Sequence, residues 1–397
     1  MLQTMSLKKS HYRVVVVGGG TAGIITASLL RRAGVEGIAI IEPSDRHFYQ
    51  PLWTLVGAGA VGKEASVRQE AQYIPKGVRW IQDAVVEINP DQQSIATHSD
   101  ECIRYDFLVV AAAVDLNWDA IPGLKEAIQR GDASTNDCYD LAPKTWNLIR
   151  DFKSGTALFH MPGTPIKCLG APQKIMYLAA DHFRRKGILQ NVNIIYGSAL
   201  PSIYGVKEYA SVLNQVLFRY RIDAHFNHEL IEIRPEKGEA LFQLKNDLAS
   251  HRVTIPYDIL HVVPPQRAPG FIRESVLADP QKPNEGWVRV DRHTLQHVDC
   301  PNVFALGDVA GTPNAKTGAA AVRQAWVVAS NLLALFKGRE PVVRYNGYIA
   351  CPIVTGYGRM LLCEIDYTGQ PAPMIPIIDS FRERYDMWLL KKYGLPQ

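Results

Sequence analysis

The cysteine at position 168 lies in a setting that favours a reactive thiol. In the stretch TPIKCLGAPQK, residues 164–174, it directly follows Lys167 and precedes the start of an expected helix. A neighbouring cation and a helix N-terminus both lower a thiol pKa, which increases the fraction of nucleophilic thiolate. The alternative is an inert cysteine that packs as a small hydrophobic residue. Cys168 is therefore a candidate redox centre.

A second candidate is Cys351, in the stretch GYIACPIVTGYGRMLLCEIDY. Pro352 favours an extended backbone at this cysteine, and a hairpin-like turn is expected near residues 356–358. Cys363 falls in the returning strand, where we expect it to pack. The other cysteines have no adjacent helper and are interpreted as structural: Cys102, Cys138 and Cys300. The sequence separation does not show whether Cys168 and Cys351 meet.

The elements around Cys168 repeat a strand–loop–helix–strand order. Residues 157–160 predict a strand, a helix starts near Pro172, and residues 192–196 predict the next strand. The loop MPGTPIKCLGA lacks the GxGxxG pattern of a dinucleotide-binding turn, and the second strand does not end in an acidic residue. We therefore expect this unit to have lost a nicotinamide site.

The N-terminal stretch RVVVVGGGTAGIITASLLRRAGVEGIAIIEPS carries the strongest nucleotide-binding pattern. Gly18, Gly20 and Gly23 form GxGxxG between a β-branched strand and a helix, whose N-terminus would face a pyrophosphate. Glu42 ends the second strand, where a carboxylate accepts ribose hydroxyls. This motif by itself does not distinguish FAD from NAD.

The far end of the chain favours FAD. CPNVFALGDVAG places Asp308 directly after a strand, where two-dinucleotide flavoproteins bring an aspartate to the ribityl chain. The next helix would aim its N-terminus at the isoalloxazine. A helix-capping aspartate is the alternative. The expected elements of this domain are strands at 13–17, 38–41, 105–114 and 303–306 and helices at 22–32 and 317–336.

Composition excludes several other classes. The 397 residues suffice for two or three domains, and a net charge of +4 without a Lys/Arg block gives no support for nucleic-acid binding. Six cysteines in so long a chain do not indicate a disulfide scaffold, and no two have CxxC spacing, so we expect neither a thioredoxin-type dithiol nor a zinc ribbon, and no metal site. We expect no secretory signal and no transmembrane helix.

Four motifs together resemble the sulfide:quinone oxidoreductase family, in the branch that includes the mitochondrial enzyme: SDRHFYQPLWTLVGAGA, PIKCLGAPQKIMYLA, LQHVDCPNVFALGDVAGTPNAKTGAAAV and YNGYIACPIVTGYGRMLL. The likeness runs from about Tyr12 to Met387. It implies an α/β fold with two Rossmann-like domains of the FAD-dependent pyridine nucleotide-disulfide oxidoreductase type. The expected domains are a split FAD-binding domain at 11–118 and 284–340, a second Rossmann-like domain without a usable NAD motif at 119–283, and a C-terminal quinone and membrane region at 341–397.

The resemblance also implies a reaction. Hydrosulfide attacks a Cys168–Cys351 disulfide or trisulfide, Cys351 becomes a persulfide, and Cys168 leaves as the thiolate and then attacks the flavin C4a. Two electrons thereby enter FAD, and a ubiquinone-type quinone reoxidises it. The sulfane sulfur passes to glutathione, sulfite, cyanide or polysulfide. Which cysteine carries the persulfide stays open.

Further site residues follow from the resemblance. Together with the motif glycines and Thr317, at the start of the helix after Asp308, it places non-covalent FAD contacts at Thr21, Ala22, Glu42, Gln50, Val85, Asp308 and Lys316. A solvated surface lysine is the alternative for Lys316. Tyr357 is a candidate quinone contact, with core packing as its alternative.

The C-terminal stretch SFRERYDMWLLKKYGLPQ predicts a basic, aromatic amphipathic helix: Phe381, Tyr385, Trp388 and Leu389 share a face flanked by Arg382, Arg384, Lys391 and Lys392. Such a helix suits a bilayer surface, and docking on its own domain is the alternative. Family members commonly have a longer apolar tail, so a truncated chain with a weakened membrane hold is expected. The expected location is peripheral, on a bacterial cytoplasmic membrane or a mitochondrial inner membrane.

Three other functions remain open. A type II NADH:quinone oxidoreductase of the same fold should have GxGxxG in the second unit. A sulfide dehydrogenase would pass its electrons to a haem partner. A flavin-bearing scaffold protein would not turn over at all.

Overall fold

The computed structural model describes residues 9–245, 251–375 and 377–395, and the chain divides into two compact units. The first unit contains the chain up to Phe48, Arg68–Asp115 and Gln266–Ile349. The second unit contains Tyr49–Val67, Leu116–Pro265 and the chain from Ala350 onward. Residues 49–67 and 350–397 thus belong to the same unit as the middle of the chain.

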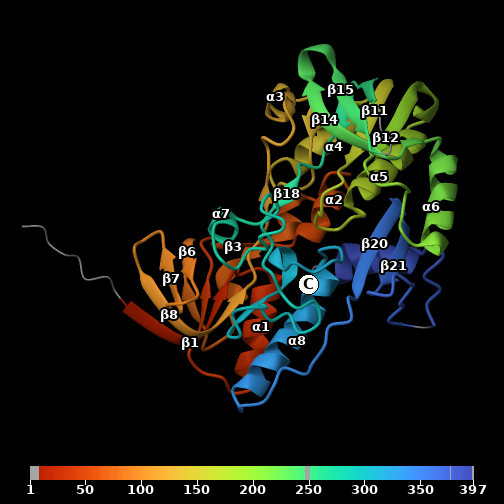
Figure 1. Cartoon of the computed structure of the whole chain (residues 1–397). Coiled ribbons are helices and arrows are strands. Elements are labelled where there is room, and N and C mark those ends of the chain that lie inside the picture. Colours follow the sequence, from red (N-terminus) through yellow and green to blue (C-terminus); the bar gives the residue numbers. More distant parts are fainter. Residues whose placement is uncertain (1–8, 246–250, 376, 396–397) are drawn as a thin grey trace, which may run out of the picture. The chain divides into compact units, whose positions relative to one another are not determined.

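The first unit is built on a sheet whose parallel strands follow the order β5 (Arg79–Ile81), β2 (Ile38–Ile41), β1 (Lys9–Val17), β8 (Cys102–Val110) and β19 (Val303–Ala305). Next to β8, strands β7 (Ser94–Thr97) and β6 (Val85–Asn89) extend it in antiparallel fashion (Figure 1). Val14, Val15 and Val16 are fully buried. Burial on both faces of a parallel sheet explains why this strand is a continuous β-branched run.

Helices α1 (Thr21–Arg32) and α8 (Gly318–Leu335) pack against each other in the first unit (Figure 1). Gly18 has φ +110° at the turn that leads from β1 into α1. A Cβ on Gly23 would lie 2.0 Å from the Gly18 carbonyl oxygen. Only glycine at both positions lets α1 begin so close to the strand.

The second unit has a parallel sheet in the order β10 (Ala133–Ser134), β17 (Ile259–His261), β11 (Gly155–Met161), β12 (Val192–Ser198) and β13 (Asp223–His225). Its main helices are α4 (Ala142–Asp151), α5 (Ala171–Arg185) and α6 (Lys207–Tyr220). An antiparallel sheet is formed by β14 (His228–Arg234), β15 (Glu239–Leu244) and β16 (Arg252–Pro256). Almost every residue of α5 as far as Phe183 is buried, so this helix is the rigid centre of the unit.

A hairpin of β20 (Ile349–Gly356) and β21 (Arg359–Ile365) follows, with Gly358 at φ +82° in its turn. Helix α9 (Tyr385–Leu389) packs on β21 and continues as a π-helical turn over Leu390–Gly394. The expected amphipathic helix is therefore shorter than its pattern suggested, because Phe381 and Arg382 precede it and Arg384 is its N-cap.

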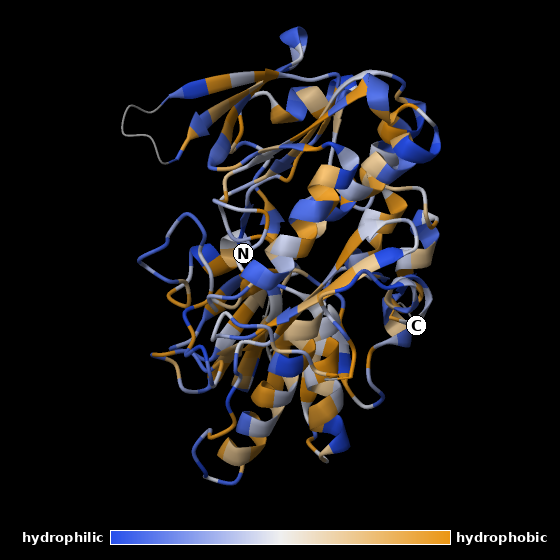
Figure 2. Cartoon of the chain, turned by 90° about the vertical axis from the view of Figure 1, so that its right-hand side faces the viewer, coloured by the Kyte–Doolittle hydropathy of each residue, from blue (hydrophilic) through white to orange (hydrophobic). Residues whose placement is uncertain are grey.

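The remaining elements are short: β3 (Arg46–Phe48), α2 (Trp53–Val56), β4 (Val67–Gln69), β9 (Asp115–Leu116), α3 (Leu124–Arg130), β18 (Gln266–Arg267) and α7 (Gly270–Arg273). Figure 2 shows hydrophobic and hydrophilic residues alternating along the helices, as expected for helices with one buried face. No helix within the described ranges is long and apolar enough to cross a bilayer. The expected α/β class with Rossmann-like units is confirmed.

The glycines of the first turn give a test of this packing. Gly23→Ala should lower the stability of the apoprotein by about 2 kcal/mol, because the new methyl group meets a backbone carbonyl that has little room to move. Gly20→Ala is the matched control, since no atom lies within 4 Å of a Cβ built there. Urea unfolding of both variants measures the difference, and equal midpoints would contradict the packing argument.

Candidate active site

Cys168 and Cys351 meet in the second unit although 183 residues separate them. Their Sγ atoms are 3.4 Å apart, and both are free thiols. Cys168 comes from the loop between β11 and α5, and Cys351 is buried on β20. The two sulfurs are thus close enough for a disulfide to form after a small approach.

The loop backbone at Cys168 is shaped for this contact. Cys168 has φ +55°, a left-handed conformation that costs a non-glycine residue roughly 1 kcal/mol or more. The Ala171 N–H donates to the Cys168 carbonyl at 2.7 Å and closes the turn into α5. A Cβ on Gly170 would lie 2.5 Å from the Cys351 Sγ. Gly170, which the sequence patterns did not single out, makes room for the second thiol.

The cation at Cys168 is Lys174, not the adjacent Lys167. The Lys174 Nζ donates to the Cys168 Sγ at 2.9 Å, and its side chain is buried in α5. The Lys167 Nζ instead donates to the Gln50 Oε1 at 2.6 Å. The expectation that Lys167 would serve as this cation was wrong. The loop turns into α5 directly after Gly170, and the first turn of that helix brings the Lys174 side chain back to the Cys168 sulfur.

These contacts shift the pKa values of the two thiols in opposite directions. The pKa of Cys168 lies well below its usual value, because it accepts a hydrogen bond from Cys351 and faces the Lys174 ammonium, although burial opposes this. The pKa of Cys351 lies well above its usual value, because its proton is held by Cys168 and burial disfavours the anion. Burial alone would lower the pKa of Lys174, but attraction to the two sulfurs outweighs burial and raises it. The thiolate is therefore favoured at Cys168 and the protonated thiol at Cys351.

A second buried lysine contributes to the same field. Lys391, from the C-terminal π-helical turn, donates to the Pro51 carbonyl at 3.0 Å. Burial and the nearby Lys174 lower its pKa to about 7. Its positive charge also lowers the pKa of Cys168. The sequence pattern put Lys391 beside the apolar face of this segment, and in the structure its side chain is buried in the second unit.

Tyr357 lies at the hairpin turn of the second unit. Its hydroxyl donates to the Ala58 carbonyl, its N–H donates to Asp181 at 3.0 Å, and its ring meets the buried Trp388 edge-on. Burial raises its pKa. Trp388 is buried, so this side chain follows the alternative in which the C-terminal segment docks on its own domain. Cys363 is fully buried in β21, as the packing interpretation expected.

The nucleotide loop of the first unit is shaped to receive a pyrophosphate. No side chain caps the N-terminus of α1, and the space beside the Gly20 Cα is open for at least 4 Å. The Glu42 carboxylate accepts the N–H groups of Gly19 at 2.8 Å and Ser44 at 2.9 Å. Each of its oxygens keeps lone pairs for ribose hydroxyls. The loop and Glu42 therefore fit the adenosine diphosphate part of FAD.

The other expected flavin contacts are distributed as follows. Lys316 is buried, donates to the Ala310 carbonyl at 2.9 Å and lies 4.0 Å from the centroid of the Trp287 ring, so its surface alternative is wrong. Burial lowers its pKa to about 8, against the attraction of Asp308. The Thr317 hydroxyl caps α8 through the Ala320 N–H. The first unit contains Thr21, Ala22, Val85 and Asp308 as well, whereas Gln50 lies in the second unit.

The loop after β11 is covered by an ion pair of its own unit. Glu229 and Lys245 pair at 2.7 Å, and a Cβ on Gly163 would lie 2.5 Å from the Glu229 Oε2 and 2.0 Å from the Lys245 Nζ. In a dinucleotide-binding turn this position belongs to the ligand's phosphates. Where a glycine motif would leave this space open for phosphates, the present chain fills it with the Glu229 carboxylate and its partner Lys245.

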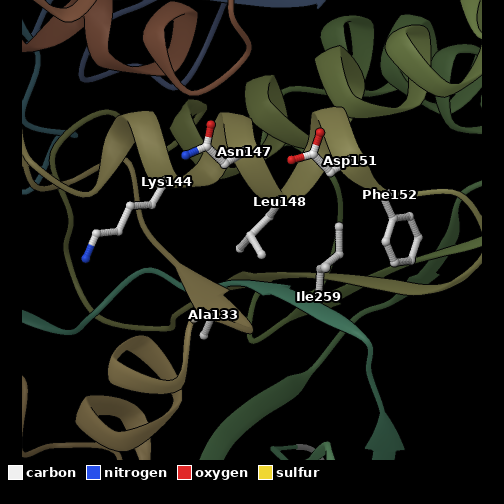
Figure 3. A pocket seen from close by; sticks show the side chains of 8 residues that line it. Ala133, Lys144, Asn147, Leu148, Asp151, Phe152 and Ile259 are labelled. Atoms are coloured by element: carbon white, nitrogen blue, oxygen red, sulfur yellow. The ribbon is translucent and has the colours of Figure 1, made fainter.

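A pocket of about 430 Å³ opens elsewhere in the second unit, lined by Gly131, Ala133, Lys144, Asn147, Leu148, Asp151, Phe152 and Ile259 (Figure 3). It lies at the amino ends of β10 and β17, whereas ligands of parallel sheets bind at the carboxyl ends. It contains no residue of the thiol site. Within the described ranges, no group of three His, Cys, Asp or Glu side chains could hold a metal ion.

Comparisons with known proteins agree with this geometry. The chain matches the pyridine nucleotide-disulphide oxidoreductase family over residues 12–150. It is 44% identical to the mitochondrial sulfide:quinone oxidoreductase of Mus musculus and 39% identical to that of Dictyostelium discoideum, over 98% of this chain and 85% of each relative. The solved sulfide:quinone oxidoreductase of Aquifex aeolicus superposes with a TM-score of 0.80 at 19% identity, over 98% of this chain and 90% of that one. From these identities over almost its whole length, the chain belongs to the sulfide:quinone oxidoreductase family.

Proposed function

We propose that this chain oxidises hydrogen sulfide to sulfane sulfur at Cys168 and Cys351 and delivers two electrons through FAD to a ubiquinone-type quinone. The observation that carries the proposal is the 3.4 Å contact of the two sulfurs, with a buried ammonium 2.9 Å from one of them. Thiol–disulfide exchange needs an accessible sulfur to attack and a stable thiolate to leave. Cys168 suits the second task, because the Lys174 ammonium stabilises its thiolate.

We base the two roles on the asymmetry of the pair. Hydrosulfide attacks the Cys351 sulfur of the oxidised pair, the S–S bond breaks, and Cys351 becomes the persulfide. The bond's electron pair leaves with Cys168, whose lowered pKa makes it the better leaving group. Lys174 and Lys391 stabilise the thiolate that results. The sulfane sulfur then passes to a small nucleophile such as glutathione, sulfite, cyanide or polysulfide.

FAD, bound non-covalently, supplies a two-electron acceptor that the quinone reoxidises. The residues proposed to hold it are Gly18, Gly20, Thr21, Ala22, Gly23, Glu42, Gln50, Val85, Asp308, Lys316 and Thr317. Those at the start of α1 donate N–H groups to the pyrophosphate, and Glu42 accepts the ribose hydroxyls. Tyr357 is proposed as a quinone contact, and its anchored hydroxyl would leave only the ring face for that purpose.

We place the protein at a membrane surface, either a bacterial cytoplasmic membrane or a mitochondrial inner membrane. The C-terminal segment exposes several apolar side chains, namely Met374, Ile375, Ile377, Phe381, Tyr385, Leu389, Leu390 and Tyr393. Lys392 lies among them. Apolar residues mixed with a cation suit an anionic bilayer interface.

The type II NADH:quinone oxidoreductase alternative is less supported. Its nicotinamide turn is missing from the sequence, and the Glu229–Lys245 ion pair fills the space beside Gly163 in the loop after β11. The alternative of a flavin-bearing scaffold without turnover predicts a flavin that sulfide does not reduce.

The central test is anaerobic reduction of the flavin by sulfide. Sulfide should bleach the flavin band of the holoenzyme, and a quinone should restore it, whereas NADH should have little effect. Cys168→Ser and Cys351→Ser should each abolish bleaching while retaining FAD, because the exchange needs both sulfurs. Cys138→Ser, in the same unit, is the matched control. Full activity in either active-site variant would refute the two-cysteine mechanism.

Lys174 gives a second test. Lys174→Met should reduce the rate of sulfide-driven bleaching about tenfold or more near neutral pH, because loss of the ammonium raises the Cys168 pKa and leaves less thiolate. The deficit should shrink as the pH rises and the thiol ionises, and Lys174→Arg should rescue part of the rate. Stopped-flow absorbance over a pH series measures this. A pH-independent deficit would show that Lys174 does not act through the thiolate.

Membrane binding is tested with the exposed C-terminal side chains. Leu389→Asp combined with Tyr393→Asp should reduce flotation with anionic phospholipid vesicles, because both side chains are exposed and a charge there opposes insertion. Val276→Asp, at an exposed position of the first unit, is the control. Equal flotation of the double variant and wild type would exclude this surface as the membrane contact.

A further inference from the structure

The half-buried Glu42 lies near another carboxylate, the buried Glu70. Glu70 starts a short 3-10 helix (Glu70–Gln72) and is 1% exposed. Its Oε1 has no hydrogen-bond partner. After burial and the two backbone hydrogen bonds, the charge of Glu70 is the next influence on the pKa of Glu42, and it raises that pKa. A like charge nearby disfavours the ionised form of a carboxylate.

The nearby cation is the side chain of His47. Its Nδ1 lies 3.2 Å from the Glu70 Oε2, and the Tyr73 ring stacks on the imidazole with centroids 4.9 Å apart. Its charge, when present, lowers the pKa of Glu42. His47 thus acts on Glu42 in the sense opposite to Glu70.

Both carboxylates lie against the nucleotide loop. A Cβ on Gly19 would lie 2.5 Å from the Glu70 Oε1 and 2.7 Å from the Glu42 Cγ. This explains a glycine at a position that the GxGxxG motif leaves variable. The Gly19 N–H donates to Glu42, and the unpartnered Glu70 oxygen lies against the same glycine.

The other groups around Glu42 carry little competing charge. Its side chain accepts the Gly19 and Ser44 N–H groups, and its backbone carbonyl accepts the Trp80 indole N–H. Asp45 and Arg46 are largely exposed and lie 3.9 Å from each other, so water screens them. The buried Glu70 and the half-buried His47 are the ionisable groups that act on Glu42.

We propose that Glu70 and His47 are positioning residues that set the charge on Glu42 and thereby control how binding of the FAD adenosine ribose depends on pH. The inference rests on the proposed flavin cofactor. Ribose hydroxyls donate best to an ionised carboxylate. Ionised Glu70 favours protonation of Glu42 and weakens this acceptor, whereas protonated His47 preserves it.

The test measures FAD affinity of the apoprotein by flavin fluorescence quenching over the acidic pH range in which it stays folded. The affinity of the wild type should fall as Glu42 takes up a proton. Glu70→Gln should extend tight binding to lower pH by about half a unit or more, because a like charge is removed. His47→Gln keeps a donor toward Glu70 but removes the charge, so its affinity should fall at higher pH than in the wild type.

Opposite shifts distinguish an electrostatic role from a structural one. The double variant with both changes should return close to the wild-type midpoint, and Asp45→Asn should leave it unchanged. Thermal unfolding of each apoprotein identifies folded variants, and either single variant decides the question by the direction of its shift. Shifts in the same direction, or none, would overturn the inference while leaving FAD binding intact. A wild type that binds no FAD at any pH would overturn the proposed cofactor as well.

Discussion

The chemistry of the second unit depends on one charge pair, the buried Lys174 ammonium and the half-buried Cys168 sulfur. A buried ammonium without a partner costs several kcal/mol. Each group therefore fixes the charged state of the other. Helix α5, buried along most of its length, holds the lysine rigidly at 2.9 Å from the sulfur. Cys351 can then keep its proton, and the two sulfurs become unequal although they are chemically identical.

The two units use the same strand–turn–helix device for different purposes. In the first unit the turn consists of three glycines, so no side chain covers the backbone N–H groups at the start of α1. In the second unit the turn carries a thiol, and Glu229 with Lys245 lies over its glycine. The scaffold is thus independent of what binds at it, and the side chains in the turn decide the chemistry.

The C-terminal segment has two faces with different physical tasks. Trp388 and Lys391 point into the second unit, where the lysine adds positive charge near the thiols. Tyr385, Leu389 and Tyr393 stay exposed. The segment therefore links the electrostatics of the thiol site to the surface that we propose meets a membrane.

Sequence patterns alone determined the α/β class, the nucleotide turn with Glu42, the missing second glycine motif and the two candidate cysteines, because each depends on residues close together in the chain. Tertiary structure alone decided which side chains meet. It brought Cys351 to Cys168, replaced Lys167 by Lys174, turned Lys391 inward and set Glu70 and His47 beside Glu42. These contacts join residues from different elements, and their distances follow from how strands and helices pack, which local periodicity does not encode.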